Sequence, residues 1–144
     1  MRRRLAGSMA LDTSALLELV FSTPPGLRLK EALLEERVIG HTSEFNLFEL
    51  EYVLCRRLGW DEASRRVRAL ADSGYVVVHE TRRLADAAAL LKCKHSIAAG
   101  DCFTLAVARR IEGPALFARR ERELAEALER GGLGVEVLFL EELA

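Results

Sequence analysis

The stretch Met9-Ala10-Leu11-Asp12-Thr13-Ser14-Ala15-Leu16 decides the fold, because a short apolar strand ends at a carboxylate and passes directly into a helix. Burying a lone carboxylate is costly unless its pKa shifts or a cation compensates its charge. Acidic residues interrupt two other apolar stretches, Glu49 within 45–50 and Asp101 within 97–103. Carboxylates brought together repel one another unless a divalent metal neutralises them. The sequence therefore predicts a metal-dependent enzyme.

Short β-rich runs alternate with longer helical patterns along the rest of the chain, which is typical of a parallel sheet covered on both faces. Strands are expected at 9–12, 38–41, 75–79, 115–118 and 135–140. Helices are expected at 14–20, 27–36, 44–57, 60–72, 82–92, 99–111 and 121–130, with Pro24-Pro25-Gly26 as a break before the second helix. We therefore expect an α/β fold with a central parallel sheet of about five strands and two consecutive helices between the second and third strands.

The 144 residues fit one domain, which would bury roughly two-thirds of its unfolded surface. Residues 1–8 are basic, but no apolar segment of a signal peptide follows them. We expect an N-terminal extension at 1–8 and a single domain at 9–144, with Met9 as a second candidate start.

Charge and cysteine content narrow the class of protein further. A formal net charge of −1 gives no global signature of nucleic-acid binding, so any polyanion site must be a local patch. The apolar runs are too short for a membrane span, so we expect no membrane association. Cys55, Cys93 and Cys102 are odd in number and lack zinc-site spacing. These features favour a soluble cytoplasmic protein with reduced cysteines.

The three carboxylates are expected at one end of the sheet, because ligands of an open parallel sheet bind beyond the carboxyl ends of its strands. Asp12 ends the first strand, Glu49 follows the second by about two helical turns, and Asp101 lies in the first turn of a helix. Each alone has a simpler explanation, as a helix cap or as the edge of an apolar face. Together they form an oxygen-only set suited to a hard divalent ion such as Mg²⁺ or Mn²⁺.

Three stretches closely resemble the acidic motifs of PIN-domain ribonucleases, particularly the VapC toxins of prokaryotic toxin–antitoxin pairs. They are Leu11-Asp12-Thr13-Ser14-Ala15-Leu16, Ser43-Glu44-Phe45-Asn46-Leu47-Phe48-Glu49 and Ser96-Ile97-Ala98-Ala99-Gly100-Asp101-Cys102-Phe103-Thr104-Leu105-Ala106. Their order and spacing extend the resemblance over about residues 9–140.

This resemblance implies a three-layer α/β/α sandwich that hydrolyses RNA with Mg²⁺ or Mn²⁺, with Asp12, Glu49 and Asp101 as catalytic metal ligands. The chemistry agrees, since a metal-bound water is a usable nucleophile near neutral pH and one or two ions stabilise phosphoryl transfer. The resemblance also implies a small antitoxin protein as inhibitor. Thr13 and Ser14 place hydroxyls near Asp12, either for the site or for capping the following helix.

The fourth acid of the family departs from its usual pattern. Members commonly carry a Thr-x-Asp word after the fourth strand, whereas this chain has Ala118-Arg119-Arg120-Glu121. If the following helix sets the alignment, Glu121 takes the position of the family's aspartate and Arg119 that of its threonine. An ungapped alignment from the strand instead places Arg120 at the position of the aspartate. We choose Glu121 as the fourth catalytic and metal-binding residue.

Several other features have both a functional and a structural explanation. The histidines His41, His79 and His95 have no partner at metal-ligand spacing. The apolar residues Phe45, Leu47, Phe48 and Tyr52 suit the core or the seam of an expected homodimer. Candidate phosphate contacts, which are equally consistent with solvated helix faces, are Arg56, Arg57, Arg65, Arg66, Arg68, Arg109 and Arg110.

The primary hypothesis is a metal-dependent endoribonuclease that acts as the toxin of a toxin–antitoxin pair. The alternative is a PIN-like module that binds RNA or protein without catalysis, which the irregular fourth acid favours. A receiver-type phosphoacceptor is a third possibility, but no acidic pair precedes the first strand and no suitable late lysine is present. Metal-dependent RNA cleavage would support the endoribonuclease. Binding of RNA or a partner without metal would support the binding module, and phosphorylation of an aspartate would support the phosphoacceptor.

Overall fold

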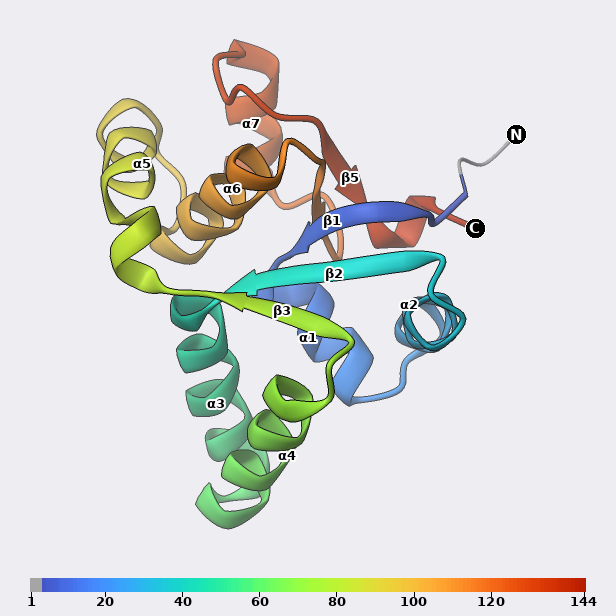
Figure 1. Cartoon of the computed structure of the whole chain (residues 1–144). Helices are drawn as coiled ribbons and strands as arrows, with labels where there is room; N and C mark the ends of the chain where they lie inside the picture. The colour runs from blue at the N-terminus through green and yellow to red at the C-terminus, as the bar shows by residue number, and fades with distance from the viewer. Residues whose placement is uncertain (1–3) are drawn as a thin grey trace.

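Five short apolar runs form one sheet within residues 4–144, the part of the chain that this computed structural model describes (Figure 1). The strands are β1 (Gly7–Leu11), β2 (Val38–Ser43), β3 (Val76–His79), β4 (Ala115–Phe117) and β5 (Val137–Phe139). The helices are α1 (Thr13–Val20), α2 (Pro24–Leu34), α3 (Glu44–Leu58), α4 (Trp60–Asp72), α5 (Thr81–Lys94), α6 (Ala99–Ile111) and α7 (Arg122–Arg130), with a 3₁₀ turn, η1 (Leu140–Glu142), after β5. The predicted α/β fold is confirmed.

The order of the strands locates the ligand crevice. All pairings are parallel and the order is β3-β2-β1-β4-β5, so β1 lies between β2 and β4. The chain runs outward from β1 to β3 and then crosses to the opposite side of β1. In such sheets ligands bind where the direction reverses, beyond the carboxyl ends of the two strands. That point lies just after Leu11 of β1 and Phe117 of β4.

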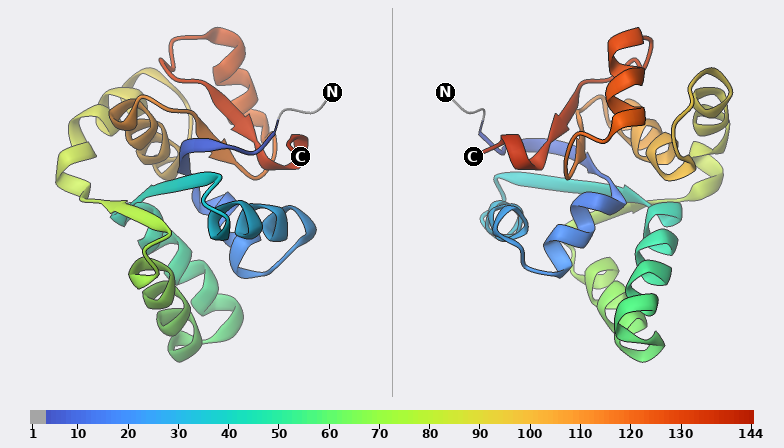
Figure 2. Two further views of the ribbon diagram at one scale, coloured as in Figure 1. Left: turned by 45° about the vertical axis from the view of Figure 1, so that its right-hand side comes forward. Right: turned by 180° about the vertical axis from the view of Figure 1, so that it is seen from behind.

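Helices cover both faces of the sheet, which gives three layers (Figure 2). Consecutive residues of β1 show the two sides, because strand side chains alternate between faces. Leu11 belongs to an apolar cluster with Leu16, Leu29 and Leu50 from the α1–α4 layer, whereas Ala10 belongs to a second cluster with residues of the α5–α7 layer. Burial of these two clusters is the main favourable contribution to folding.

Helix α2 begins earlier than the sequence predicts. Pro24 and Pro25 occupy its first turn, and Thr23 caps it by accepting a hydrogen bond from the Gly26 N–H at 3.1 Å. The first helical residues need no N–H partner within the helix, and proline has the backbone angle that a helix requires. The two prolines therefore start this helix instead of breaking the chain before it.

Strand β1 also begins earlier than expected, at Gly7 and not at Met9. Leu5 is buried, and its N–H donates to the carbonyl of Ala144 at 3.1 Å. The Gly7 N–H donates to the carbonyl of Arg37 at 2.8 Å. Residues 5–8, which we assigned to an extension, are therefore packed onto the sheet, and residues 1–3 lie outside the described part of the chain.

Among residues 4–144, no helix has both the length and the apolar composition needed to cross a membrane.

Candidate active site

Asp12 lies at the point where the strand order reverses, between the end of β1 and the start of α1. Its side chain is buried and caps α1, because Oδ2 accepts hydrogen bonds from the N–H and the hydroxyl of Ser14 at 3.0 and 2.7 Å. Its Oδ1 accepts a hydrogen bond from the hydroxyl of Thr104 on α6 at 2.6 Å. Asp12 therefore caps a helix and also lies in the crevice, so its two predicted roles are compatible.

Glu49 on α3 reaches the same crevice and is half-buried. Its Oε1 accepts a hydrogen bond from the Thr13 hydroxyl at 2.9 Å. The carboxylate lies against Gly100, where an added Cβ would be 2.0 Å from Oε1. Burial raises the pKa of Glu49, the Thr13 hydrogen bond lowers it, and the negative charge of Asp12 raises it.

Asp101 lies in the first turn of α6, where the helix dipole favours an anion. Burial raises its pKa to about 8, and the negative charges of Asp12, Glu121 and Glu49 act in the same direction. Contacts place the four predicted acids at one end of the sheet. Glu49 binds Thr13, the residue after Asp12, and lies against Gly100, the residue before Asp101. Asp101 and Glu121 border one depression.

Glu121 lies at the rim of this group. It is the N-cap residue of α7, is exposed, and borders a depression of about 610 Å³ together with Asp101 and Ser96. Arg120, the alternative in the ungapped alignment, pairs with Glu142 at 2.6 Å and lies over the ring of Phe139. Arg119 pairs with Glu18. Glu121 therefore borders the depression beside Asp101, whereas Arg119 and Arg120 are paired with other acids.

The donor chemistry of the four acids fits a hard divalent cation, because all their ligand atoms are carboxylate oxygens. Gly100 leaves room for the Glu49 carboxylate beside Asp101, so two carboxylates lie close together where a cation would neutralise their charge. However, no three acidic, histidine or cysteine side chains within residues 4–144 already form a metal-binding group. Asp12 and Glu49 are turned towards hydroxyl donors instead, so metal binding requires their oxygens to be shared or reoriented.

Two polar residues of the site escaped the sequence analysis. Asn46 on α3 and Thr104 on α6 are both fully buried between the acids, and Thr104 donates to Asp12. The available signal was the amide of Asn46 within the apolar stretch Phe45-Asn46-Leu47-Phe48, three residues before Glu49. A buried side-chain amide needs hydrogen-bond partners, which makes it as informative as a buried acid.

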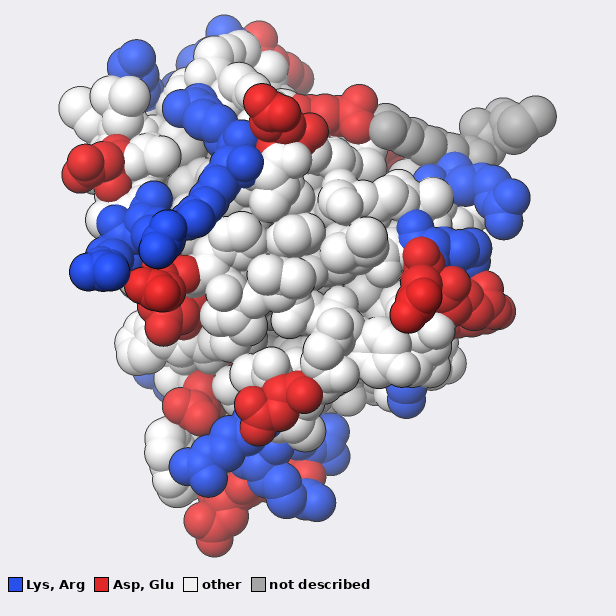
Figure 3. Space-filling model, viewed as in Figure 1, with Lys and Arg blue, Asp and Glu red and all other residues white. Residues whose placement is uncertain are grey.

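The structure pairs two of the histidines outside the acidic group. Nδ1 of His41 on β2 lies 3.0 Å from Nε2 of His79 on β3. Burial lowers the pKa of both, and the positive charge of Arg110 also lowers the pKa of His79. The two histidines thus lie side by side on neighbouring strands. The face of the molecule shown in Figure 3 has mostly uncharged residues at its centre and charged residues around them.

The candidate phosphate-binding arginines are mostly engaged with other groups. Arg56 lies over the ring of Tyr52 and Arg57 over the ring of Phe21. Arg65 and Arg66 both pair with Glu62. Contacts of this kind at exposed positions are weak.

Exposed aromatic rings on α3 adjoin the site. The rings of Phe45 and Phe103 stack at 4.5 Å, and Phe48 and Tyr52 continue the row along α3. Phe48 is 60% exposed and Tyr52 37% exposed. These two rings therefore lie outside the core, contrary to one of the two explanations that their sequence pattern allows.

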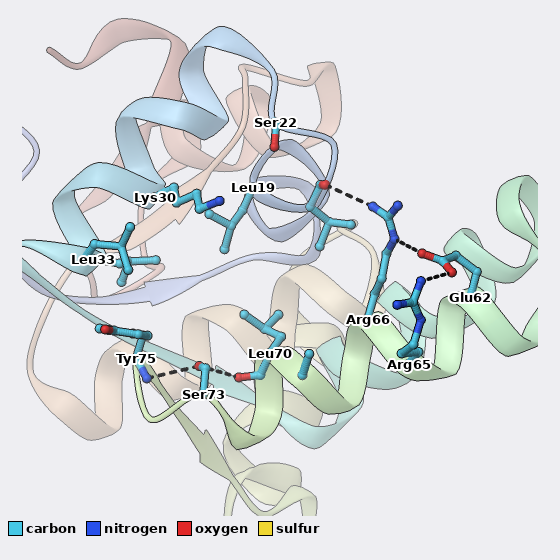
Figure 4. A pocket seen from close by; sticks show the side chains of 13 residues that line it. Leu19, Ser22, Lys30, Leu33, Glu62, Arg65, Arg66, Leu70, Ser73 and Tyr75 are labelled. Carbon is cyan, nitrogen blue, oxygen red and sulfur yellow. Dashed lines mark hydrogen bonds and ion pairs between the residues drawn. The ribbon is translucent and has the colours of Figure 1, made fainter.

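An apolar pocket of about 470 Å³ lies apart from the four acids (Figure 4). Leu19 of α1, Leu33 of α2 and Leu70 of α4 form its walls, and Lys30 and Arg66 lie at its edge. Glu62 also lines the pocket and pairs with Arg65 and Arg66, so its rim carries both charges. Apolar walls with a polar rim suit an apolar segment of a partner.

Comparison with known proteins gives a consistent family and fold. A family model described as "PIN domain" matches residues 9–129. VapC20 of Mycobacterium tuberculosis, described as a sarcin–ricin-loop-cleaving toxin, aligns with TM-score 0.64 and 20% identity, over 82% of this chain and 93% of that chain. No curated protein sequence matches the chain.

Two structures of complexes also share the fold. VapBC2 of Rickettsia felis, bound to a promoter DNA fragment, aligns with TM-score 0.64 and 12% identity, over 92% of this chain and 98% of that chain. A toxin–antitoxin complex of Klebsiella pneumoniae aligns with TM-score 0.63 and 13% identity, over 94% of this chain and 99% of that chain.

Proposed function

The chain belongs to the PIN-domain family, and from this membership we propose that it is a metal-dependent endoribonuclease, the toxin of a toxin–antitoxin pair. The observation that carries the proposal is the gathering of acids at the carboxyl ends of the strands, where Asp12 follows β1, Glu49 lies against Gly100 beside Asp101, and Glu121 borders the same depression as Asp101. Four carboxylates at the strand ends of an open α/β sheet are suited to holding cations against a phosphodiester.

In this proposal Asp12, Glu49 and Asp101 hold Mg²⁺ or Mn²⁺, and Glu121 contacts a second ion or an ordered water. The bound ion supplies a nucleophilic water near neutral pH and neutralises charge on the phosphate. Asp101 must release its proton before it can accept a cation, so cation binding strengthens as pH rises. The exposed arginines Arg56 and Arg57 at the end of α3 attract the RNA backbone.

We also propose that a small antitoxin protein is the physiological partner. The similar structures include complexes described as toxin–antitoxin, and the apolar pocket between α1, α2 and α4 offers such a partner a surface next to the toxin core. The exposed rings of Phe48 and Tyr52 support a homodimer seam, because exposed aromatic side chains are enriched at interfaces.

A non-catalytic PIN-like module that binds RNA or protein is the alternative. Two observations favour it: Glu121 is exposed at the rim, and no ready-made group of metal ligands exists within residues 4–144. Such a module would bind its partner equally well with and without divalent ions.

Cleavage of labelled single-stranded and hairpin RNAs with Mn²⁺ or with EDTA decides between the two. We expect endonucleolytic products with Mn²⁺ only, and their loss in Asp12→Asn. Asp61→Asn, which alters an exposed acid at the far end of the α3–α4 hairpin, is the matched control and should cleave at the parental rate. RNA binding without any cleavage in Mn²⁺ would contradict the endoribonuclease and support the binding module.

A further inference from the structure

Asn46 lies at the centre of the proposed active site but carries no charge. Its side chain is completely buried in the first turn of α3, at 0% exposure. It contacts Ser43 at the end of β2, Thr13 at the start of α1 and Thr104 of α6. One amide therefore joins the segments that carry Asp12, Glu49 and Asp101.

Ser43 fixes which way the amide of Asn46 points. The Ser43 hydroxyl oxygen accepts a hydrogen bond from the backbone N–H of Asn46 at 2.9 Å, as the cap of α3. Its own proton is then free to be donated to Oδ1 of Asn46, at 2.5 Å. An amide has its donors on nitrogen and its acceptors on oxygen, so Nδ2 must face the opposite way.

On that opposite side Nδ2 of Asn46 meets two threonine hydroxyls. It lies 3.1 Å from Oγ1 of Thr13 and 3.1 Å from Oγ1 of Thr104, with the carbonyl of Gly100 also within reach at 3.2 Å. An amide nitrogen can only donate, so each threonine oxygen is an acceptor in this contact. A hydroxyl has a single proton, which each threonine must therefore donate elsewhere.

For both protons a carboxylate is the nearest acceptor, although a backbone carbonyl is also within reach of each hydroxyl, that of Asn46 at 3.3 Å from Thr13 and that of Gly100 at 3.0 Å from Thr104. Thr13 donates to Oε1 of Glu49 at 2.9 Å, and Thr104 donates to Oδ1 of Asp12 at 2.6 Å. Hydrogen bonds from hydroxyls to carboxylates are stronger than those between neutral groups. Each carboxylate oxygen retains a further lone pair on which a cation can bind.

We propose that Asn46 is a positioning residue of the active site, which acts through Thr13 and Thr104 to hold the Glu49 and Asp12 carboxylates in place beside the crevice. This inference rests on the proposed function, because it assigns Asn46 a role in cation binding. Donors of this kind around metal ligands fix ligand orientation and typically change metal affinity by 10- to 100-fold.

The test measures Mn²⁺ affinity by calorimetry in the absence of RNA. Thr104→Val removes one hydroxyl without changing side-chain shape, and it should weaken Mn²⁺ binding by about tenfold or more, whereas Thr104→Ser keeps the hydroxyl and should restore binding. Thr42→Val is the matched control, because Thr42 is equally buried but its hydroxyl donates to the backbone carbonyl of Leu11 at 3.0 Å. It should lose stability without losing Mn²⁺ affinity.

A double-mutant cycle tests whether Asn46 acts through the threonines. Asn46→Ala should weaken Mn²⁺ binding in the parent, but should have little further effect in the Thr13→Val, Thr104→Val background. Fully additive losses, or a Thr104→Val variant that melts earlier yet binds Mn²⁺ at the parental affinity, would overturn the inference. Parental protein that binds Mn²⁺ but cuts no RNA would instead refute the endoribonuclease and leave the role of Asn46 in cation binding intact.

Discussion

The carboxylate of Glu49 occupies the space in which a side chain at Gly100 would lie, since a Cβ there would be 2.0 Å from Oε1 of Glu49. Gly100 belongs to the first turn of α6, the helix that carries Asp101. The absence of a side chain at one position thus lets α3 and α6 bring two acids together. This close approach, and not backbone flexibility, accounts for the glycine.

Gly100→Ala should separate stability from activity. Alanine is favoured over glycine in a helix by about 1 kcal/mol, and the group that it would strike is the movable end of a glutamate, so the free energy of unfolding should stay constant or rise. The displaced Glu49 carboxylate should lower Mn²⁺-dependent cleavage by about tenfold or more. Thermal melts and cleavage rates check the two effects. Ala99→Gly is the control, which should lower stability and leave cleavage unchanged. Cleavage at the parental rate by Gly100→Ala would show that catalysis does not need the Glu49 carboxylate beside Gly100.

Asp12→Asn should abolish cleavage without unfolding the protein. Asparagine caps helices about as well as aspartate, so the free energy of unfolding should change by less than about 1 kcal/mol. Removing an anionic metal ligand should lower the rate by a factor on the order of 100 or more, because a bound metal contributes several kcal/mol of transition-state stabilisation. Chemical denaturation and single-turnover cleavage measure the two quantities. A large loss of stability would mean that Asp12 is chiefly a structural cap.

The stability of the metal-free protein should fall as pH rises, because burial raises the pKa of Asp101 from its ordinary value of 3.8 to about 8. Between these two values the folded state keeps a proton on Asp101 that the unfolded state has released. The unfolded state therefore binds fewer protons, and stability decreases with pH across this window. Melts in EDTA between about pH 4 and about pH 8 should show this slope.

Asp101→Asn should remove most of that pH dependence and raise the melting temperature near neutral pH by several degrees. The control Asp61→Asn should keep the parental slope. An unchanged slope in Asp101→Asn would mean that Asp101 is already ionised in the folded protein.

Glu121→Gln should reduce Mn²⁺-dependent cleavage substantially, but less than Asp101→Asn does, because Glu121 lies at the rim and would contact a second ion or an ordered water. Glu123→Gln is the matched control, since Glu123 is also exposed in the first turn of α7 and borders the same depression. Side-by-side rates at saturating Mn²⁺ check the order. Equal, near-parental rates for the two glutamine variants would leave a site of three carboxylates.

The positions of Asp12, Glu49 and Asp101 could be predicted because each interrupts an apolar element, and a buried charge has few structural explanations. Their role as metal ligands stays a prediction. Glu121 was harder, because strand β4 and helix α7 imply different alignments of the residues between them. Asn46 and Thr104 were missed, since neutral polar residues in a helix become informative only when their partners are known. His41 and His79 meet through the β2–β3 register, which sequence spacing alone does not reveal.

The helices were predicted well where turn residues and apolar periodicity agree. Residues 60–72 and 99–111 match α4 and α6 at both ends. The start of α2 was misplaced because prolines are compatible with both a break and a first helical turn. The observed strand ends differ from the predicted ends by up to two residues. Pairing with neighbouring strands decides where a strand ends, and local residue preference does not.

The local hydrogen bonds from Ser14 to Asp12 are completed by residues far along the chain. Thr104 lies 92 positions after Asp12, and Ser14, which also binds Asp12, is held by the N–H of Ala118 at 104 positions. The N-terminal half of the chain is therefore synthesised with Asp12 and Ser14 but without Thr104 and Ala118, which hold them in place. The site is complete only when α6 and β4 have been synthesised and have folded back onto β1, so its assembly is a late event in the folding of this chain.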